Sequence, residues 1–139
     1  MTAPAPLPRL LLAVAAGGAV GALMRWSLGQ AVPDGSGFPW TTFGINVVGS
    51  LTLALLPAWA AIRRSQTLAV AAGPGLLGGF TTLSAYAEQS RSLLGDGRTT
   101  LAGAYLLGTL AACLVAATIA NHWSAPAARA EFAAEGGDE

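Results

Sequence analysis

The sequence contains no lysine, one cysteine and one histidine, and only 10% of its residues are charged. A single cysteine forms no disulfide within the chain and no cysteine metal cluster, so Cys113 is interpreted as a small buried hydrophobic residue. Without a cluster of basic residues, the chain offers no surface for nucleic acid. No nucleophile, metal cluster or phosphate loop accompanies the lone histidine, His122, so an enzyme is not predicted.

What the sequence does contain is apolar residues. Hydrophobic residues make up 53% of the 139 positions, and the mean hydropathy is +0.56. A soluble domain of this size carries roughly a quarter charged residues. Four apolar stretches approach the roughly 20 residues that a helix needs to cross a bilayer: Leu10–Leu28, Trp40–Ile62, Leu68–Tyr86 and Leu101–Ile119. The sequence therefore predicts an all-α membrane protein with four transmembrane helices.

The segments between these stretches hold prolines, glycines and most of the charges, and they are predicted to be loops. Arg9 precedes an apolar run that resembles a signal peptide. The run continues past any cleavage site and three similar segments follow, which favours a first transmembrane helix. We expect one four-helix domain over residues 1–123, followed by an acidic tail, residues 124–139, that is disordered or a frayed helix.

The arginines show little bias toward one side of the membrane. Four fall on one side and three on the other: Arg9, Arg63, Arg64 and Arg129 against Arg25, Arg91 and Arg98. Either the protein inserts in both orientations, or Arg129 of the tail should not be counted when the orientation is inferred. Because four helices enclose little interior, a polar pathway would need a second copy. Two copies inserted in opposite senses would be related by a twofold axis in the membrane plane.

Small residues recur along one face of the first helix. Gly17, Gly21, Arg25 and Gly29 are spaced by four, so they share a face. Glycines at this spacing let another helix approach closely. Arg25 is costly in a membrane unless it faces water, a partner or an ion path, or extends to the interface. Both interpretations of Arg25 remain open.

The third segment contains residues that weaken a helix. Pro74 lies between two glycines, and Gly78 with Gly79 lowers helix propensity by roughly 1 kcal/mol per residue. We expect either a helix break at these glycines or a kink packed against a neighbour. A break in a bilayer frees backbone groups that protein, water or an ion must satisfy. Freed carbonyls suit a hard cation such as Na⁺, whereas N–H groups and hydroxyls suit an anion.

The polar side chains within the spans are neutral. The amide of Asn46 must bond either another helix or a solute. The hydroxyls either bond their own helix backbone or line a path together with Asn46: Thr81, Thr82, Ser84, Tyr86, Tyr105 and Thr109. No Asp, Glu or Lys lies deep in a span. The set is therefore dominated by neutral hydrogen-bond donors.

Three stretches resemble one known family. They are "GGAVGALMRW", "FPWTTFGINVVGS" and "GLLGGFTTLSAYAE", and together they resemble the small bacterial fluoride channels called Fluc or CrcB. The likeness covers about Leu10 to Ile119. It implies an antiparallel, dual-topology dimer in the inner (plasma) membrane, with two pores that export fluoride passively. The fluoride would have entered as HF from acid surroundings.

The resemblance also implies site residues. It implies a structural Na⁺ at the dimer centre, held by backbone carbonyls of Gly78 and Thr81. It places Arg25 and Glu88 in a vestibule. The implied fluoride pathway is lined by Thr42, Asn46, Leu83, Ser84, Tyr86, Tyr105 and Thr109.

The chain departs from the family pattern after the break. The family has two phenylalanines whose ring edges face fluoride, and here these positions are Leu83 and Tyr86, with Ala85 replacing a threonine. Leucine has no ring, so half of the aromatic arrangement is missing. Either Tyr86 alone supplies an edge, or the chain pairs with a related subunit that carries the missing phenylalanine.

Two other functions are compatible with four small spans. A proton-coupled multidrug-type transporter needs a membrane-embedded carboxylate, for which Glu88 is the only candidate. A non-transporting scaffold would use every polar position to join helices. Measuring the release of fluoride from liposomes would distinguish a channel from both the transporter and the scaffold.

Overall fold

The computed structural model describes residues 6–134, which form helices and no strands. The first two spans are α1 (Leu7–Ala31) and α2 (Trp40–Leu55), which the short turn η1 (Leu56–Ala58) extends. A short helix, α3 (Ala60–Arg64), leads into the third span. That span is built from α4 (Gln66–Val70), η2 (Ala71–Leu77), α5 (Gly78–Phe80) and α6 (Leu83–Gly95), and α7 (Thr99–Ala134) follows. Four helices are long and apolar enough to cross a membrane, which confirms the four-span prediction.

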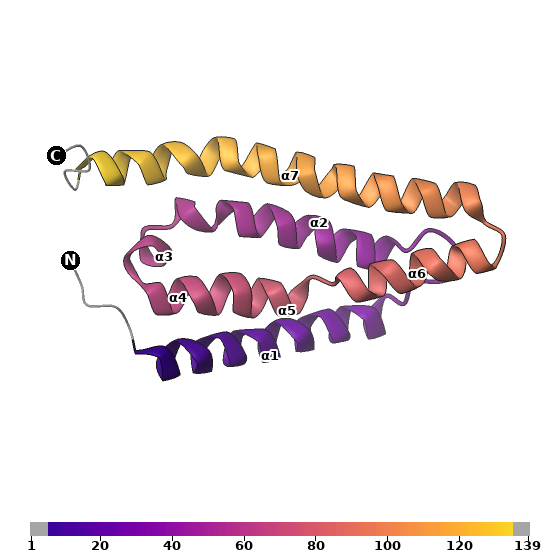
Figure 1. Cartoon of the computed structure of the whole chain (residues 1–139), viewed down its shortest axis with the longest axis horizontal. Helices are drawn as coiled ribbons and strands as arrows, with labels where there is room; N and C mark the ends of the chain where they lie inside the picture. Colours follow the sequence, from indigo (N-terminus) through magenta and orange to yellow (C-terminus); the bar gives the residue numbers. More distant parts are fainter. Residues whose placement is uncertain (1–5, 135–139) are drawn as a thin grey trace.

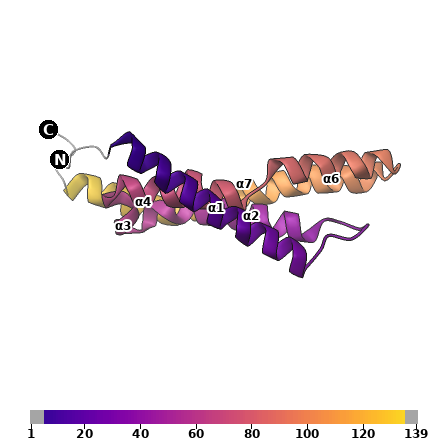
Figure 2. The ribbon, with the colours of Figure 1, turned by 90° about the horizontal axis from the view of Figure 1, so that it is seen from below.

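The third span lies between α1 and α2, and α7 lies on the other side of α2 (Figure 1). Its first half, α4 to α5, packs against α1, whereas its second half, α6, packs against α7. Figure 2 shows the consequence: α6 and α7 run together past the point where α1 and α2 diverge from them. The third span therefore changes partner at its break.

The glycine face of α1 packs directly on the backbone of the third span. A Cβ at Gly17 would overlap the carbonyl of Ala71, and one at Gly21 would overlap the carbonyl of Leu76. The close approach expected from the glycine spacing is confirmed at these two positions. Gly29 has no heavy atom within 4 Å of such a Cβ, so the contact ends before the last glycine of the series.

The helix break lies after the paired glycines rather than at them, which corrects the expected position. Gly78 is helical, with φ −65° and ψ −34°. Thr81 and Thr82 are extended, with ψ of 159° and 117°. A Cβ at Gly79 would overlap the backbone of Gly18. Gly79 therefore serves helix packing, and the two threonines form the break.

The segment η2 around Pro74 is a turn of π-helix. Proline has no N–H to donate, and its ring clashes with the carbonyl four residues earlier. A wider turn accommodates the ring by moving that carbonyl away. Pro74 therefore perturbs the span about two turns before the break without interrupting it.

The last helix continues beyond the expected end of the four-helix domain. Ser124, the first residue of the expected tail, is buried, and its hydroxyl donates to the carbonyl of Ala54 at 2.8 Å. The chain is helical up to Ala134, and residues 135–139 lie outside the described residues. The domain boundary at residue 123 stays a prediction.

Candidate functional site

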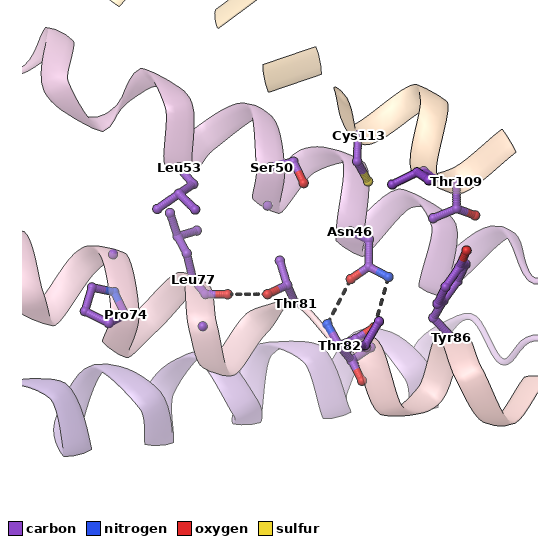
Figure 3. Close-up of a pocket in the computed structure, with 15 residues that line it drawn as sticks. Asn46, Ser50, Leu53, Pro74, Leu77, Thr81, Thr82, Tyr86, Thr109 and Cys113 are labelled. Carbon is purple, nitrogen blue, oxygen red and sulfur yellow. Dashed lines mark hydrogen bonds between the residues drawn. The ribbon is translucent and has the colours of Figure 1, made fainter. Parts of the chain in front are cut away.

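A cavity of about 570 Å³ lies between α2, the third span and α7 (Figure 3). Four of the seven residues predicted for the anion path line it: Asn46, Leu83, Tyr86 and Thr109. Both residues predicted to bind Na⁺ line it as well: Gly78 and Thr81. The structure thus brings most of the predicted site to one cavity.

The Asn46 side chain joins α2 to the helix break. Its Nδ2 donates to the carbonyl of Thr82 at 3.1 Å, and its Oδ1 accepts from the N–H of Thr82 at 2.8 Å (Figure 3). An extended residue in the middle of a span would otherwise leave both backbone groups without partners. Asn46 therefore bonds another helix, one of the two roles left open by the sequence.

At the break, two carbonyls of the third span lose their helical donors. In a continuous helix, the carbonyl of Gly78 would accept from the N–H of Thr82, and that of Thr81 from the N–H of Ala85. The first N–H instead donates to Asn46, and the second donates to the Thr82 side chain at 3.1 Å. The residues predicted to bind Na⁺ are thus those whose carbonyls lose their helical donors.

Arg25 contacts the break from the opposite side. Its Nε donates to the carbonyl of Gly79 at 3.2 Å, and the side chain is partly buried. That carbonyl lies near the C-terminal end of α5, where a cation is favourable. Arg25 therefore has a helix partner, and it is not among the residues that line the cavity.

Thr109 lines the cavity and carries a buried, unpaired hydroxyl. The residue is only 4% exposed, and among the side chains that the structure describes, Oγ1 is the one buried nitrogen or oxygen without a hydrogen-bond partner. The neighbouring Tyr86 hydroxyl donates to the carbonyl of Leu106 at 2.7 Å. In Figure 3, Tyr86 and Thr109 lie on the same side of Asn46. An unpaired buried hydroxyl is costly unless a solute bonds it.

Leu83 lies at the rim of the cavity, and two other predicted residues lie outside it. Leu83 is 78% exposed. Ser84 is exposed and shares a hydrogen bond of 3.2 Å with the Thr82 hydroxyl. Glu88 is exposed and forms an ion pair with Arg91 at 2.6 Å. Neither Ser84 nor Glu88 is among the residues that line the cavity.

Thr42 and Tyr105 belong to a second cluster with two residues that sequence reasoning missed. The Asp34 carboxylate accepts from the backbone N–H groups of Thr41 at 2.7 Å and Thr42 at 3.1 Å. It also accepts from the Thr42 hydroxyl at 2.8 Å and from Gln89 Nε2 at 3.1 Å. Tyr105 donates its hydroxyl to Gln89 Oε1 at 2.7 Å.

The hydrogen bonds of this cluster outweigh the effect of burial on Asp34. Burial alone would raise the pKa of Asp34, but bonds from Thr42, Thr41 and Gln89 lower it overall. The sequence held only a weak signal for this residue, because Asp34 lies six residues before α2 begins and not at the N-cap position, which is Pro39. Gln89 had no such signal, since its neighbours in space come from other helices.

Comparison with known proteins identifies the family. The model of the family described as CrcB-like protein, Camphor Resistance (CrcB), matches residues 12–121. "Fluoride-specific ion channel FluC 2" of Nocardia farcinica (strain IFM 10152) is 42% identical, over 93% of this chain and 99% of its own length. "Fluoride-specific ion channel FluC 1" of Streptomyces coelicolor (strain ATCC BAA-471 / A3(2) / M145) is 45% identical, over 81% of this chain and 74% of its own. The chain therefore belongs to the CrcB-like family.

Proposed function

We propose that the chain is a fluoride-selective membrane channel that exports fluoride passively. Relatives named as fluoride-specific channels match it over most of its length. The observation that carries the proposal is the unpaired hydroxyl of Thr109, buried beside a cavity within a membrane bundle. A small anion that accepts this hydrogen bond removes the cost of leaving the hydroxyl unpaired.

Neutral donors around the cavity fit fluoride. Asn46 Nδ2 carries two N–H groups and uses one of them on Thr82, so the other remains for an anion. The Tyr86 ring adds an edge with partial positive charge. Such donors replace water around a small anion, and without a fixed charge they do not trap it. We propose that Asn46, Tyr86 and Thr109 form the pathway in this protomer.

A second copy would complete the site. Hydrogen-bonding groups at the cavity are costly if they face lipid, and Leu53, Leu83 and Leu110 at its edge are at least half exposed. A second protomer over this face would enclose the cavity. The weak arginine bias supports opposite insertion of the two copies. We therefore propose an antiparallel, dual-topology dimer.

The freed carbonyls of Gly78 and Thr81 fit a hard cation. Among the side chains that the structure describes, no group of three or more His, Cys, Asp or Glu is placed to hold a metal ion. Backbone oxygens are suitable ligands for Na⁺ where helical donors are lost. Two carbonyls from each protomer would supply four ligands. Such an ion would neutralise the carbonyl dipoles at the dimer centre and fix the breaks relative to each other.

The alternative functions have less support. Glu88 is exposed and paired with Arg91, so it is poorly placed to carry protons through the cavity. A scaffold gains nothing from the unpaired hydroxyl of Thr109. Release of fluoride and chloride from liposomes that contain the purified chain separates these functions. We expect rapid loss of fluoride with chloride retained, and retention of both ions by a folded dimer would contradict the proposal.

The homodimer and heterodimer alternatives divide at Leu83. We propose that the chain conducts alone, with Tyr86 as its aromatic edge. If an added ring improves the path, Leu83→Phe speeds fluoride release about threefold, as expected for an aromatic contact worth about 0.5–1 kcal/mol. Leu83→Met, which adds length without a ring, is the control. No release by the purified chain until a related subunit is added would establish the heterodimer instead.

A further inference from the structure

The second cluster connects the loop after α1 to α6 and α7. Asp34 lies in that loop, Thr42 lies in the first turn of α2, Gln89 lies on α6, and Tyr105 lies on α7. None of the four lines the cavity. Hydrogen bonds nevertheless link them in one series from Asp34 to Tyr105.

One group sets the direction of every bond in this series. An ionised carboxylate only accepts hydrogen bonds, so the donors around Asp34 must all point toward it. Gln89 Nε2 donates to Asp34 at 3.1 Å and to the Thr42 hydroxyl at 2.9 Å. The amide oxygen of Gln89 is thereby turned toward Tyr105, whose hydroxyl donates to it at 2.7 Å. Asp34 thus determines which end of the amide faces Tyr105.

The series ends against a residue of the cavity. Tyr105 is fully buried, and its ring lies 5.2 Å from that of Tyr86, centre to centre. Tyr86 lines the cavity and its hydroxyl is bonded to Leu106. In close packing, a shift of the Tyr105 ring moves its neighbour as well. The orientation of the Gln89 amide is therefore coupled to the position of Tyr86.

We propose that Asp34 is a positioning residue for anion transport. It acts through the Gln89 amide and Tyr105 to hold the Tyr86 ring at the cavity, although it contacts neither the cavity nor the anion. The inference rests on the proposed channel function. It differs from helix capping alone, because a cap requires only the bonds from Asp34 to the backbone of Thr41 and Thr42.

The first test is Asp34→Asn. The new amide has one oxygen to accept the four hydrogen bonds that the two carboxylate oxygens accept, so Gln89 Nε2 loses its ionised acceptor. Where the new NH₂ group faces Gln89, the Gln89 amide turns over and offers Tyr105 an N–H in place of an oxygen. We expect fluoride release from liposomes to slow about tenfold, the factor for losing one bond to a charged group. The control is Asp96→Asn, which removes an exposed carboxylate from the loop after α6 and should change release less than twofold, since surface charges contribute little.

The second test is rescue by Gln89→Glu. Alone, this change places two carboxylates next to each other and should also slow release. In the double variant Asp34→Asn/Gln89→Glu, the amide at position 34 donates to the new carboxylate, which still accepts from Tyr105. We expect release to return to within about threefold of the unmodified channel, because the direction of the series is restored.

The outcomes separate the roles. Release by Asp34→Asn at the unmodified rate would overturn the proposal, and equal slowing in Asp34→Asn and the double variant would reduce Asp34 to a helix cap. If the unmodified chain releases no fluoride, the proposed function fails. In that case the Tm values of the unmodified protein, the two single variants and the double variant test the directed series. Non-additive shifts in Tm support it, and additive shifts overturn it.

Discussion

The two halves of the third span are held in place by different forces. From α4 to α5, the span packs backbone against backbone on the glycines of α1. Beyond the break, α6 is fixed by side-chain hydrogen bonds to α7 and to the loop before α2. The first contact depends on the absence of side chains, and the second depends on the orientation of a few polar groups. Shape therefore fixes one half, whereas hydrogen bonding fixes the other.

The largest expected effect comes from breaking the first contact. Gly21→Ala places a methyl group against the carbonyl of Leu76, and backbone cannot move aside as a side chain can. We expect the free energy of unfolding to fall by about 3 kcal/mol, measured by denaturant titration of the protein in detergent. Gly29→Ala on the same helix meets no atom within 4 Å and should leave stability unchanged or slightly raised. Equal effects of the two changes would refute the close contact.

Asn46 lies where the two halves meet, and its removal should have the next largest effect. Asn46→Ala leaves the N–H and the carbonyl of Thr82 without their partner. We expect a loss of about 2 kcal/mol in unfolding free energy and a fluoride release at least tenfold slower. Asn46→Asp keeps only the acceptor for the Thr82 N–H. The stability of this variant should therefore lie between that of the unmodified protein and that of Asn46→Ala. An unchanged release rate in Asn46→Ala would remove this residue from the pathway.

The smallest effect concerns the hydrogen bonds of the second half and depends on pH. Bonding lowers the pKa of Asp34 below its ordinary value of 3.8. Asp34 therefore contributes stability above that value and loses it as the pH falls through the lowered pKa. We expect the difference in Tm between the unmodified protein and Asp34→Asn to be constant from pH 7 to 5 and to shrink below 3.8. A difference that grows in acid would contradict the direction of the shift.

The same division explains what could be predicted from the sequence. The four spans and the glycine contact were predictable, because apolar length and spacing by four are local patterns. The break was misplaced by three residues, from the paired glycines to Thr81 and Thr82. Gly79 is needed for contact with Gly18, and Asn46 supports the break from another helix. No local pattern reveals such a long-range bond.

The residues of the candidate site likewise could be predicted only in part from the sequence. Asn46, Tyr86 and Thr109 lie at one cavity as the family resemblance implied. Thr42 and Tyr105 are instead bonded within the cluster of Asp34 and Gln89. Glu88 faces outward with Arg91, while the next residue, Gln89, faces inward. A shift of one residue moves a side chain about 100° around a helix, and only the packing of α6 shows which one is inside.

The most direct test of the account is the rate of fluoride release by Thr109→Val beside Thr118→Val. Both changes replace a hydroxyl of α7 by a methyl group of similar size, but the Thr118 hydroxyl is exposed and bonded to its own helix, whereas that of Thr109 is buried and unpaired. We predict that Thr109→Val slows release about tenfold, as for the loss of one hydrogen bond to an anion, and that Thr118→Val releases fluoride at the unmodified rate. Equal rates in the two variants would contradict an anion path at this cavity.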